Sequence, residues 1–152
     1  MPAPDRVDQL PIRSQPSTAA LWCLGAHGGA GESSLAELDP EWSAAGHAWP
    51  VCNSASPSKV ILVARSNARG LRAAQAAATQ WAAGLVSNVE LLGLAIVADA
   101  PGRLPRALRH QAQVIAGESR VPGTFPGWSR GAWAPHPCSK TLRVRFAASS
   151  MT

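Results

Sequence analysis

The chain has 152 residues, of which 46% are hydrophobic, and a formal net charge of +5. That length and apolar content fit one folded domain with a core and exclude an intrinsically disordered chain. No apolar run approaches the roughly 18 residues that a membrane span needs, and the first residues lack the basic-then-apolar order of a secretory signal. We therefore expect a cytoplasmic protein.

The positive charge is concentrated in the last third of the chain. Residues 1–99 carry six Lys or Arg against eight Asp or Glu, a net of −2, whereas residues 100–152 carry eight against one, a net of +7. A basic segment of this kind attracts nucleic acid or another polyanion. A solvated basic surface has the same composition, so both interpretations stay open.

The three cysteines, Cys23, Cys52 and Cys138, are widely spaced and form no CxxC pair. This spacing argues against a disulfide framework and against a zinc site. Cys23 and Cys52 lie in apolar segments, where a buried thiol packs as a small hydrophobic group.

The first third of the chain predicts an arm, two strands and a short helix. Residues 1–17 contain Pro, Asp and Ser without periodicity and are expected to form a flexible arm. The continuous apolar run 19–24 predicts a buried strand, and residues 48–52 predict a second, short strand. Between them, the spacing of apolar residues predicts a short helix over residues 34–45, although Pro40 limits its regularity.

The middle of the chain alternates strands and helices more clearly. Residues 59–64 are β-branched and continuous, which predicts a buried strand, and residues 89–97 predict another. The Ala-rich stretch 68–83 has apolar residues spaced for one helical face. Residues 105–116 predict a third helix, with proline in its first turn.

Alternation of strands and helices over ~30-residue units predicts a parallel sheet with right-handed crossovers. We expect a three-layer α/β domain over residues 18–117, with a mostly parallel sheet of about four to five strands. Residues 118–152 are expected to form a basic extension that contains Pro and Trp. Within it, the alternating pattern of residues 142–146 indicates an edge strand or a basic tail.

A glycine-rich loop follows the first predicted strand and reads Ala26-His27-Gly28-Gly29-Ala30-Gly31-Glu32-Ser33-Ser34. A loop of this kind between a buried strand and a helix is the setting in which backbone N–H groups bind phosphate. The glycines allow the backbone to curl so that these N–H groups point inward, and the helix N-terminus adds positive potential. Ser33 stands where a hydroxyl is able to ligate Mg²⁺.

The loop resembles the deviant Walker A loop of the ParA/MinD-type ATPases, Lys-Gly-Gly-x-Gly-Lys-Thr/Ser. In this alignment His27 replaces the first (signature) lysine, and Glu32 replaces the phosphate-binding lysine. Ser33 matches the magnesium ligand. The glycines of the pattern are matched by Gly28, Gly29 and Gly31.

The resemblance covers roughly residues 19–116. The strand Val60–Val63, the Arg65-Ser66-Asn67 segment and the Ala-rich helix resemble the later half of that fold, and Asp99 falls near the position of a base-contacting Asn. The chain more closely matches an uncharacterised group of short actinobacterial proteins that share a Gly-Ala-His-Gly-Gly-Ala-Gly start and an Asp-Ala-Pro-Gly-Arg-Leu-Pro segment.

The resemblance implies a truncated P-loop NTPase-like fold with ATP and Mg²⁺ as its ligands. Ser33 is the implied Mg²⁺ ligand where a nucleotide binds. The implied nucleotide- or phosphate-binding residues are His27, Gly28, Gly29, Ala30, Gly31, Glu32, Ser33, Ser34 and Asp99.

Two departures from the ATPase pattern argue against catalysis. Glu32 reverses the charge of the phosphate-binding lysine, and two unit charges ~4 Å apart interact by about 4 kcal/mol at an effective dielectric constant of ~20. Between the loop and residues 59–64, the acidic residues are Glu37, Asp39 and Glu41, and none follows an apolar strand as a Walker B Asp does. Hydrolysis needs a positioned magnesium ion and water, so we do not expect ATP turnover.

We therefore expect a degenerate P-loop protein, a pseudo-ATPase with a binding or regulatory role in plasmid or mobile-element partition or transfer. One alternative is an active ATPase in which Arg65, Arg69 or Arg103 replaces the lysine. Another is a DNA-associated interaction protein that uses the basic C-terminal third. A loop whose glycines only form a tight strand-to-helix turn is a further interpretation that the sequence leaves open.

Overall fold

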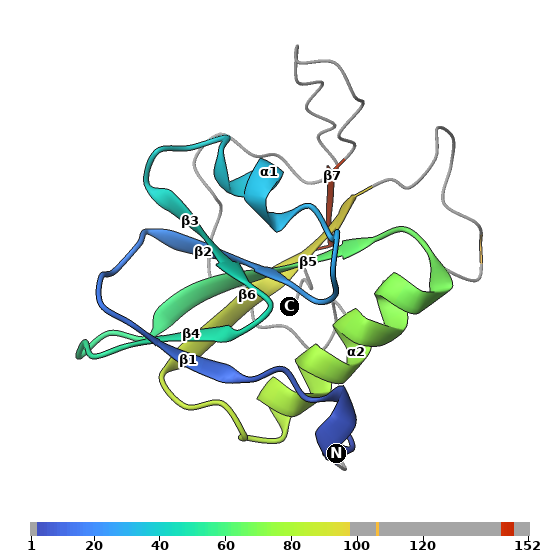
Figure 1. Cartoon of the computed structure of the whole chain (residues 1–152), viewed down its shortest axis with the longest axis horizontal. Coiled ribbons are helices and arrows are strands. Elements are labelled where there is room, and N and C mark those ends of the chain that lie inside the picture. The colour runs from blue at the N-terminus through green and yellow to red at the C-terminus, as the bar shows by residue number, and fades with distance from the viewer. Residues whose placement is uncertain (1–2, 98–105, 107–143, 148–152) are drawn as a thin grey trace, which may run out of the picture.

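The computed structural model describes residues 3–97, 106 and 144–147. These residues form a five-stranded sheet, a separate two-stranded sheet and two α-helices, an α/β fold with few helices (Figure 1). In chain order the elements are η1 (Arg6–Asp8), β1 (Ile12–Gln15), β2 (Leu21–Gly25), α1 (Glu32–Ala36), β3 (Trp42–Gly46), β4 (Trp49–Cys52), β5 (Ser58–Arg65), α2 (Ala68–Ala82), β6 (Val89–Val97) and β7 (Val144–Ala147).

The larger sheet has the strand order β3-β2-β5-β6-β7. The first four strands in this order pair in parallel, and β7 pairs antiparallel with β6. The expectation of a mostly parallel sheet is therefore confirmed. Of the two alternatives for residues 142–146, an edge strand or a basic tail, the structure shows a strand, β7, at Val144–Ala147.

Among the described residues, each face of this sheet carries a buried core and one helix. Alternate residues of β2 separate the two cores: Trp22 and Leu24 pack on the side of α2, and Leu21 and Cys23 on the side of α1. Helix α2 packs on β5 and β6, whereas α1 packs on β2 and β3 (Figure 1). Strands β2, β5 and β6 are buried on both faces along most of their length, which is why their sequences are largely continuous apolar runs.

The two-stranded sheet packs on the α2 face of the larger sheet. Strands β1 and β4 pair in parallel, and Trp49 of β4 lies in the same core as α2. The buried side chain of Gln80 on α2 fixes this arrangement: its Oε1 accepts hydrogen bonds from Leu10 N (2.9 Å) and Trp49 Nε1 (3.1 Å), and its Nε2 donates to Leu10 O (2.9 Å). Within residues 1–17, where a flexible arm is expected, residues 12–15 thus form a strand.

The predicted helix over residues 34–45 is wrong beyond residue 36. Helix α1 ends at Ala36, and residues 42–46 form β3, which pairs in parallel with β2. A turn separates the two elements, in which Asp39 Oδ1 accepts a hydrogen bond from Glu41 N at 2.8 Å. Pro40 lies in this turn and has no N–H for a continuing helix. The edge of the sheet offers pairing to residues 42–46 instead.

The other predicted elements agree closely with the structure. The strands expected at 59–64 and 89–97 are β5 and β6, and the helix expected at 68–83 is α2. The helix expected at 105–116 lies outside the described residues apart from Arg106. In the described ranges, no helix is long and apolar enough to cross a membrane.

Candidate functional site

The Gly-rich loop lies where the direction of the sheet reverses. From β2 the chain crosses over α1 to β3 on one side, and from β5 it crosses over α2 to β6 on the other side, with the two helices on opposite faces. The neighbouring strands β2 and β5 therefore flank a topological switch point. Parallel α/β sheets bind ligands in the crevice outside the carboxyl ends of the strands at such a point.

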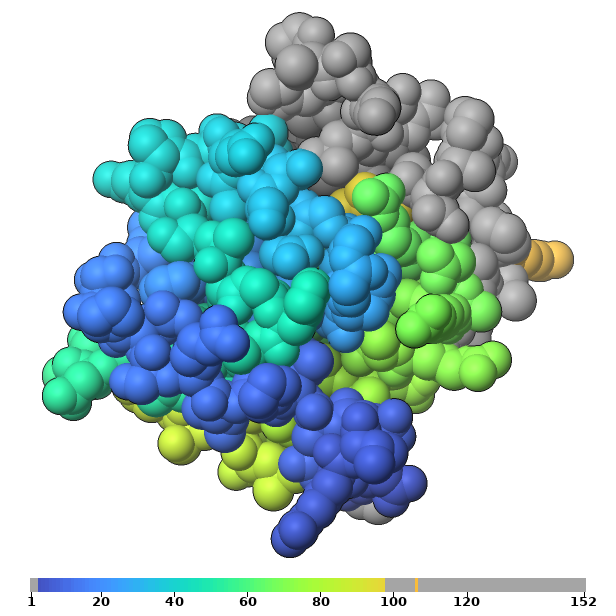
Figure 2. All heavy atoms as spheres, in the orientation of Figure 1, coloured from blue at the N-terminus to red at the C-terminus, as the bar shows by residue number. Residues whose placement is uncertain are grey.

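The loop between β2 and α1 is curled by its glycines. Gly29 and Gly31 have φ of 74° and 100°, a left-handed conformation that glycine adopts without steric cost. Gly28 and Gly29 are exposed. In Figure 2 the loop reaches the molecular surface between the cyan segment that contains α1 and β3 and the green segment of α2.

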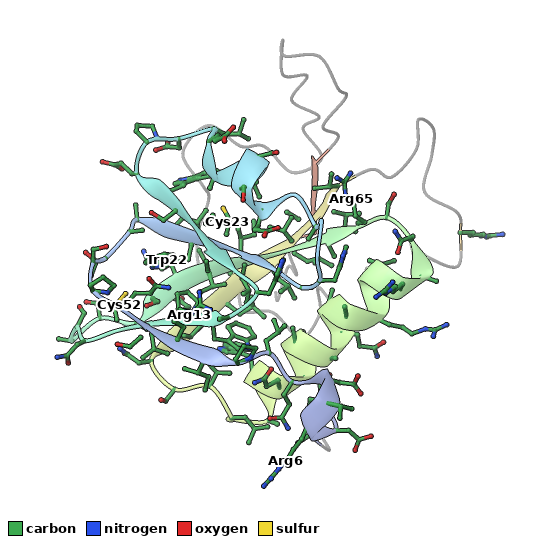
Figure 3. All side chains as sticks on the ribbon, in the orientation of Figure 1. Arg6, Arg13, Trp22, Cys23, Cys52 and Arg65 are labelled. Carbon is green, nitrogen blue, oxygen red and sulfur yellow. The ribbon has the colours of Figure 1, made fainter. Side chains whose placement is uncertain are left out.

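On the β5 side, the loop is bonded to the last residue of the strand. Arg65 N donates a hydrogen bond to His27 Nε2 at 3.0 Å, and the Arg65 side chain donates from Nε to Gly29 O at 2.8 Å. His27 Nδ1 lies 2.9 Å from Gly28 O. The Arg65 guanidinium, at the carboxyl end of β5, thus lies on the loop and has no carboxylate partner among the residues that the structure describes (Figure 3).

The first turn of α2 approaches the hydrogen-bonded residues His27 and Arg65 through Gly70. An ideal Cβ at Gly70 would lie 2.6 Å from Arg65 O and 2.9 Å from His27 Nε2. The N-cap residue Asn67 accepts a hydrogen bond from Gly70 N at 2.7 Å, which fixes where the helix begins. The absence of a side chain at this position is what allows α2, the loop and β5 to meet.

Gly70→Ala should therefore lower the free energy of unfolding by up to about 2 kcal/mol. Alanine favours a helix over glycine by ~1 kcal/mol, but forcing a methyl group against backbone atoms costs about 1 to 3 kcal/mol. Urea unfolding followed by circular dichroism measures the difference. The matched control is Gly28→Ala, because nothing lies within 4 Å of a Cβ there, and it should leave stability unchanged. An equal effect of the two substitutions would contradict the contact.

On the β3 side, Glu32 turns inward. Its side chain is only 11% exposed, and a Cβ on Gly25 would lie 2.7 Å from Glu32 Cδ. His47, one residue beyond β3, lies with Nε2 3.7 Å from Glu32 Oε1 and with Nδ1 3.1 Å from Gly25 O. The first residue of α1 is thus an anion paired with a histidine at the carboxyl edge of the sheet.

The thiol of Cys23 lies on the same side of the sheet as this pair. Burial, with a smaller contribution from the Glu32 carboxylate, raises the pKa of Cys23 to about 12. The thiol is therefore protonated and unreactive at neutral pH. The expectation that Cys23 and Cys52 are buried is confirmed.

The remaining predicted site residues differ in their exposure and in their contact with the loop. Ala30 is buried, whereas Ser33 and Ser34 are exposed on the first turn of α1. Asp99 lies outside the described residues. Of the three arginines considered as replacements for the lysine, Arg65 contacts the loop, Arg69 is exposed on α2, and Arg103 lies outside the described residues.

Sequence reasoning did not identify His47 as a site residue. The reason is that β3 was predicted to be helical, so the residue after it had no expected place at the edge of the sheet. A strand assignment for residues 42–46 would have placed His47 beside the loop. Across the described ranges, no group of three or more His, Cys, Asp or Glu side chains has an arrangement that could hold a metal ion.

Comparison with known protein families gives one match. Residues 19–145 match a family of unknown function, DUF6668. The chain belongs to this family. The match begins at the residues leading into β2 and includes the loop, α2, β6 and part of β7, so the whole switch-point site of this DUF6668 protein lies inside the family region. No curated protein and no solved structure is significantly similar to the chain.

Proposed function

We propose that this DUF6668 protein is a degenerate P-loop protein, a pseudo-ATPase that binds or regulates and does not turn over ATP. The observation that carries this proposal is the inward position of Glu32. Its carboxylate lies against Gly25 with 11% of the side chain exposed, at the position that matches the phosphate-binding lysine of the ParA/MinD-type ATPases. A buried negative charge there opposes a phosphate by about as much as a lysine would favour it.

The position of His47 supports the same proposal. In the ATPases the strand with the Walker B aspartate lies, along the chain, between the loop and the strand that matches Val60–Val63. Here β3 lies in that interval and pairs with the loop strand β2. The residue after β3 is His47, which pairs with Glu32. The Lys and Asp of an active site would thus be replaced by Glu and His.

The acidic residues of the interval support the absence of turnover. Asp39 and Glu41 belong to the turn before β3, at the amino end of that strand, and Glu37 is the exposed C-cap residue of α1. A carboxylate that holds Mg²⁺ beside the loop must lie at the carboxyl end of the strand. Neither this turn nor the C-cap provides one, so the segment between the loop and β5 offers no carboxylate for such a metal ion.

The proposed role is regulation or binding in plasmid or mobile-element partition or transfer, by resemblance to the ParA/MinD-type ATPases. Calorimetric titration with ATP, GTP and ADP in the presence of Mg²⁺, together with a phosphate-release assay, tests the biochemical part. We expect no detectable phosphate release. Release at a steady rate that is lost in Gly29→Val would overturn the proposal.

A second candidate function is an active ATPase that uses Arg65 in place of the lysine. The specific observation in its favour is the hydrogen bond from Arg65 Nε to Gly29 O at 2.8 Å, which holds a guanidinium against the loop. Arginine is a strong phosphate ligand because of its fixed donor geometry. This candidate requires nucleotide binding that falls in Arg65→Ala and persists in Arg69→Ala, the exposed neighbour on α2. Equal behaviour of the two variants would remove it.

The third candidate, DNA association through the basic C-terminal third, concerns residues that lie almost entirely outside the described ranges. Its test is retention on duplex DNA at ~50 mM salt and loss of retention as salt rises, because phosphate contacts release counterions. An absence of retention at ~50 mM salt would exclude it.

A further inference from the structure

Residues 3–20 lie on the surface of the domain. The structure describes this stretch throughout, and none of its residues is buried. Ile12 in β1 is 52% exposed, and Leu10 and Ala19, which pack against the core, are only partly buried. In Figure 2 the blue segment that contains η1 and β1 forms part of the visible surface. Hydrogen bonds, and not buried side chains, are therefore the main link between β1 and the rest of the chain.

One edge of β1 bonds the main chain of β4. Pro11 O accepts a hydrogen bond from Trp49 N at 2.8 Å, and the parallel pairing continues to the end of both strands. Backbone polar groups of successive residues point to opposite edges of a strand, so those of Arg13 also face β4 and those of Ser14 face away. Pairing of this kind uses the main chain of β1 and not its side chains.

On the other edge, the side-chain amide of Gln80 takes the place of a neighbouring strand. Its Oε1 accepts a hydrogen bond from Leu10 N and its Nε2 donates one to Leu10 O, both at 2.9 Å. Trp49 Nε1 donates to the same Oε1 at 3.1 Å, which orients the amide. Gln80 is 2% exposed and Trp49 is fully buried, so the groups that bind residue 10 are fixed in the core.

These groups need an extended segment beside them. In the described part of the chain, the acceptor for Gln80 Nε2 is Leu10 O, and β4 pairs with no strand other than β1. If β1 left, a buried amide donor and the edge of a strand would lose their partners, which is unfavourable for polar groups in a core. Any segment that offers a main-chain N–H and C=O at the position of Leu10 restores the same bonds.

The groups that bind β1 lie inside the family region, whereas β1 lies outside it. The match to DUF6668 covers residues 19–145, which include β4 and Gln80 but not residues 9–15. Main-chain hydrogen bonds provide affinity with little demand on side chains, which is the mode in which extended peptides add to the edge of a sheet. The contact between β1 and β4 has the form of a bound peptide.

We propose that the edge of β4 and the amide of Gln80 form a docking groove for an extended segment of a partner protein. Residues 9–15, here called the strap, occupy this groove and are displaced when the partner binds. The partner segment has an apolar residue other than proline at the position of Leu10. A tethered strap competes at an effective concentration on the order of millimolar, so it keeps weak partners out. The groove lies at the last turn of α2 and is independent of the Gly-rich loop, which meets the first turn.

Amide hydrogen exchange in the full parent chain tests whether the strap opens by itself. The N–H groups of Leu10 and Trp49 bond across the strap, whereas those of residues 61–63 lie in the centre of the main sheet. After correction for intrinsic rates, we expect the first two to exchange at least about 100-fold faster, because local opening needs less free energy than global unfolding. Exchange of both groups at the same rate would show that the strap leaves only on global unfolding, and would overturn the proposal.

A matched pair of full-length proline variants tests the groove. Arg13→Pro removes an N–H that faces β4, whereas Ser14→Pro, the control, removes one that faces away. The probe is a fluorescent peptide with the sequence of residues 5–17, followed by anisotropy. We expect it to bind Arg13→Pro at least about tenfold more tightly than Ser14→Pro, because only Arg13→Pro vacates the groove. Absence of binding to a folded Arg13→Pro, or equal binding to the two variants, would overturn the proposal.

A second peptide tests the role of Gln80 without changing the protein. With N-methylleucine at the position of Leu10, the peptide keeps the side chain but has no N–H for Gln80 Oε1. Its binding to Arg13→Pro should be at least about tenfold weaker than that of the unmodified peptide. Equal binding of the two peptides would show that the amide of Gln80 does not recognise the main chain. A dimer of the parent chain in light scattering that is lost in Arg13→Pro would overturn the partner assignment in favour of the strap of a second copy.

Discussion

The double substitution Glu32→Lys with His47→Asp should give the chain an affinity for ATP·Mg²⁺ at least about 100-fold above that of the parent. It replaces a buried repulsive charge by an attractive one, and a change of about 4 kcal/mol in either direction exceeds the ~2.7 kcal/mol that corresponds to 100-fold. The aspartate keeps an opposite charge beside position 32, where His47 now lies 3.7 Å from Glu32. Calorimetric titration with ATP and Mg²⁺ measures the gain.

The control for this experiment is Glu37→Lys, which makes the same charge change at an exposed position of the same helix. Glu32→Lys alone should give a smaller gain than the double variant, because the new lysine then faces His47. If the double variant binds ATP no better than Glu37→Lys, the correspondence between position 32 and the lysine of a P-loop fails.

The free energy of unfolding should fall by about 2 kcal/mol between pH 8 and pH 10.5 because of Cys23 alone. Its pKa rises from 9.0 to about 12 on folding, so the folded chain keeps the thiol proton while the unfolded chain loses it. Stability from this group is complete below about pH 9 and is lost as the pH rises toward 12, at about 1.4 kcal/mol per pH unit. The chain has no tyrosine, which keeps other alkaline titrations few.

Urea unfolding at intervals of pH, followed by circular dichroism, measures this loss. In Cys23→Ala the alkaline decline should largely disappear, whereas Cys52→Ala should keep it. Cys52 is the matched control because it is also buried, but its Sγ donates a hydrogen bond to Ser17 O at 3.2 Å on the other face of the sheet. A parallel decline in all three proteins would show that the folded thiol of Cys23 ionises as readily as the unfolded one.

The distribution of charge distinguishes this switch point from a phosphate site built around a lysine. Negative charge lies inside, at Glu32, where it is paired with His47, and positive charge lies on the rim, at Arg65. An external phosphate would therefore meet the guanidinium before the carboxylate. For this reason, the double variant Glu32→Lys with His47→Asp tests the inner part of the site, and Arg65→Ala tests its rim.

The sequence pattern was sufficient to predict those elements whose conformation follows from their own residues. The β-branched run of β5 and the one-faced helix α2 were predicted to within two residues at each end, because apolar periodicity directly reflects which faces are buried. Strand β3 was missed for the opposite reason. The Trp-Ser-Ala-Ala-Gly segment has weak preference in isolation, and its conformation comes from the free edge of β2 with which it pairs.

Strand β1 shows the same limit. Nothing in the sequence of residues 12–15 indicates that their partner is β4 rather than a strand of the main sheet. Their position depends on Gln80, a residue 70 positions away from Leu10, whose amide group bonds the backbone there. The residues around Gln80 in this Ala-rich helix do not indicate that its side chain bonds Leu10. The contact forms because the helix packs against the segment before β1 in the folded chain.

The α/β class, the main parallel strands and the presence of a Gly-rich loop were predictable from the sequence, because these follow from periodicity and residue identity. The tertiary structure alone decided that Glu32 faces inward, that His47 meets it and that Arg65 lies on the loop. Those contacts join residues 15 to 36 positions apart, and they arise only when the carboxyl ends of β2, β3 and β5 are brought to one edge of the sheet.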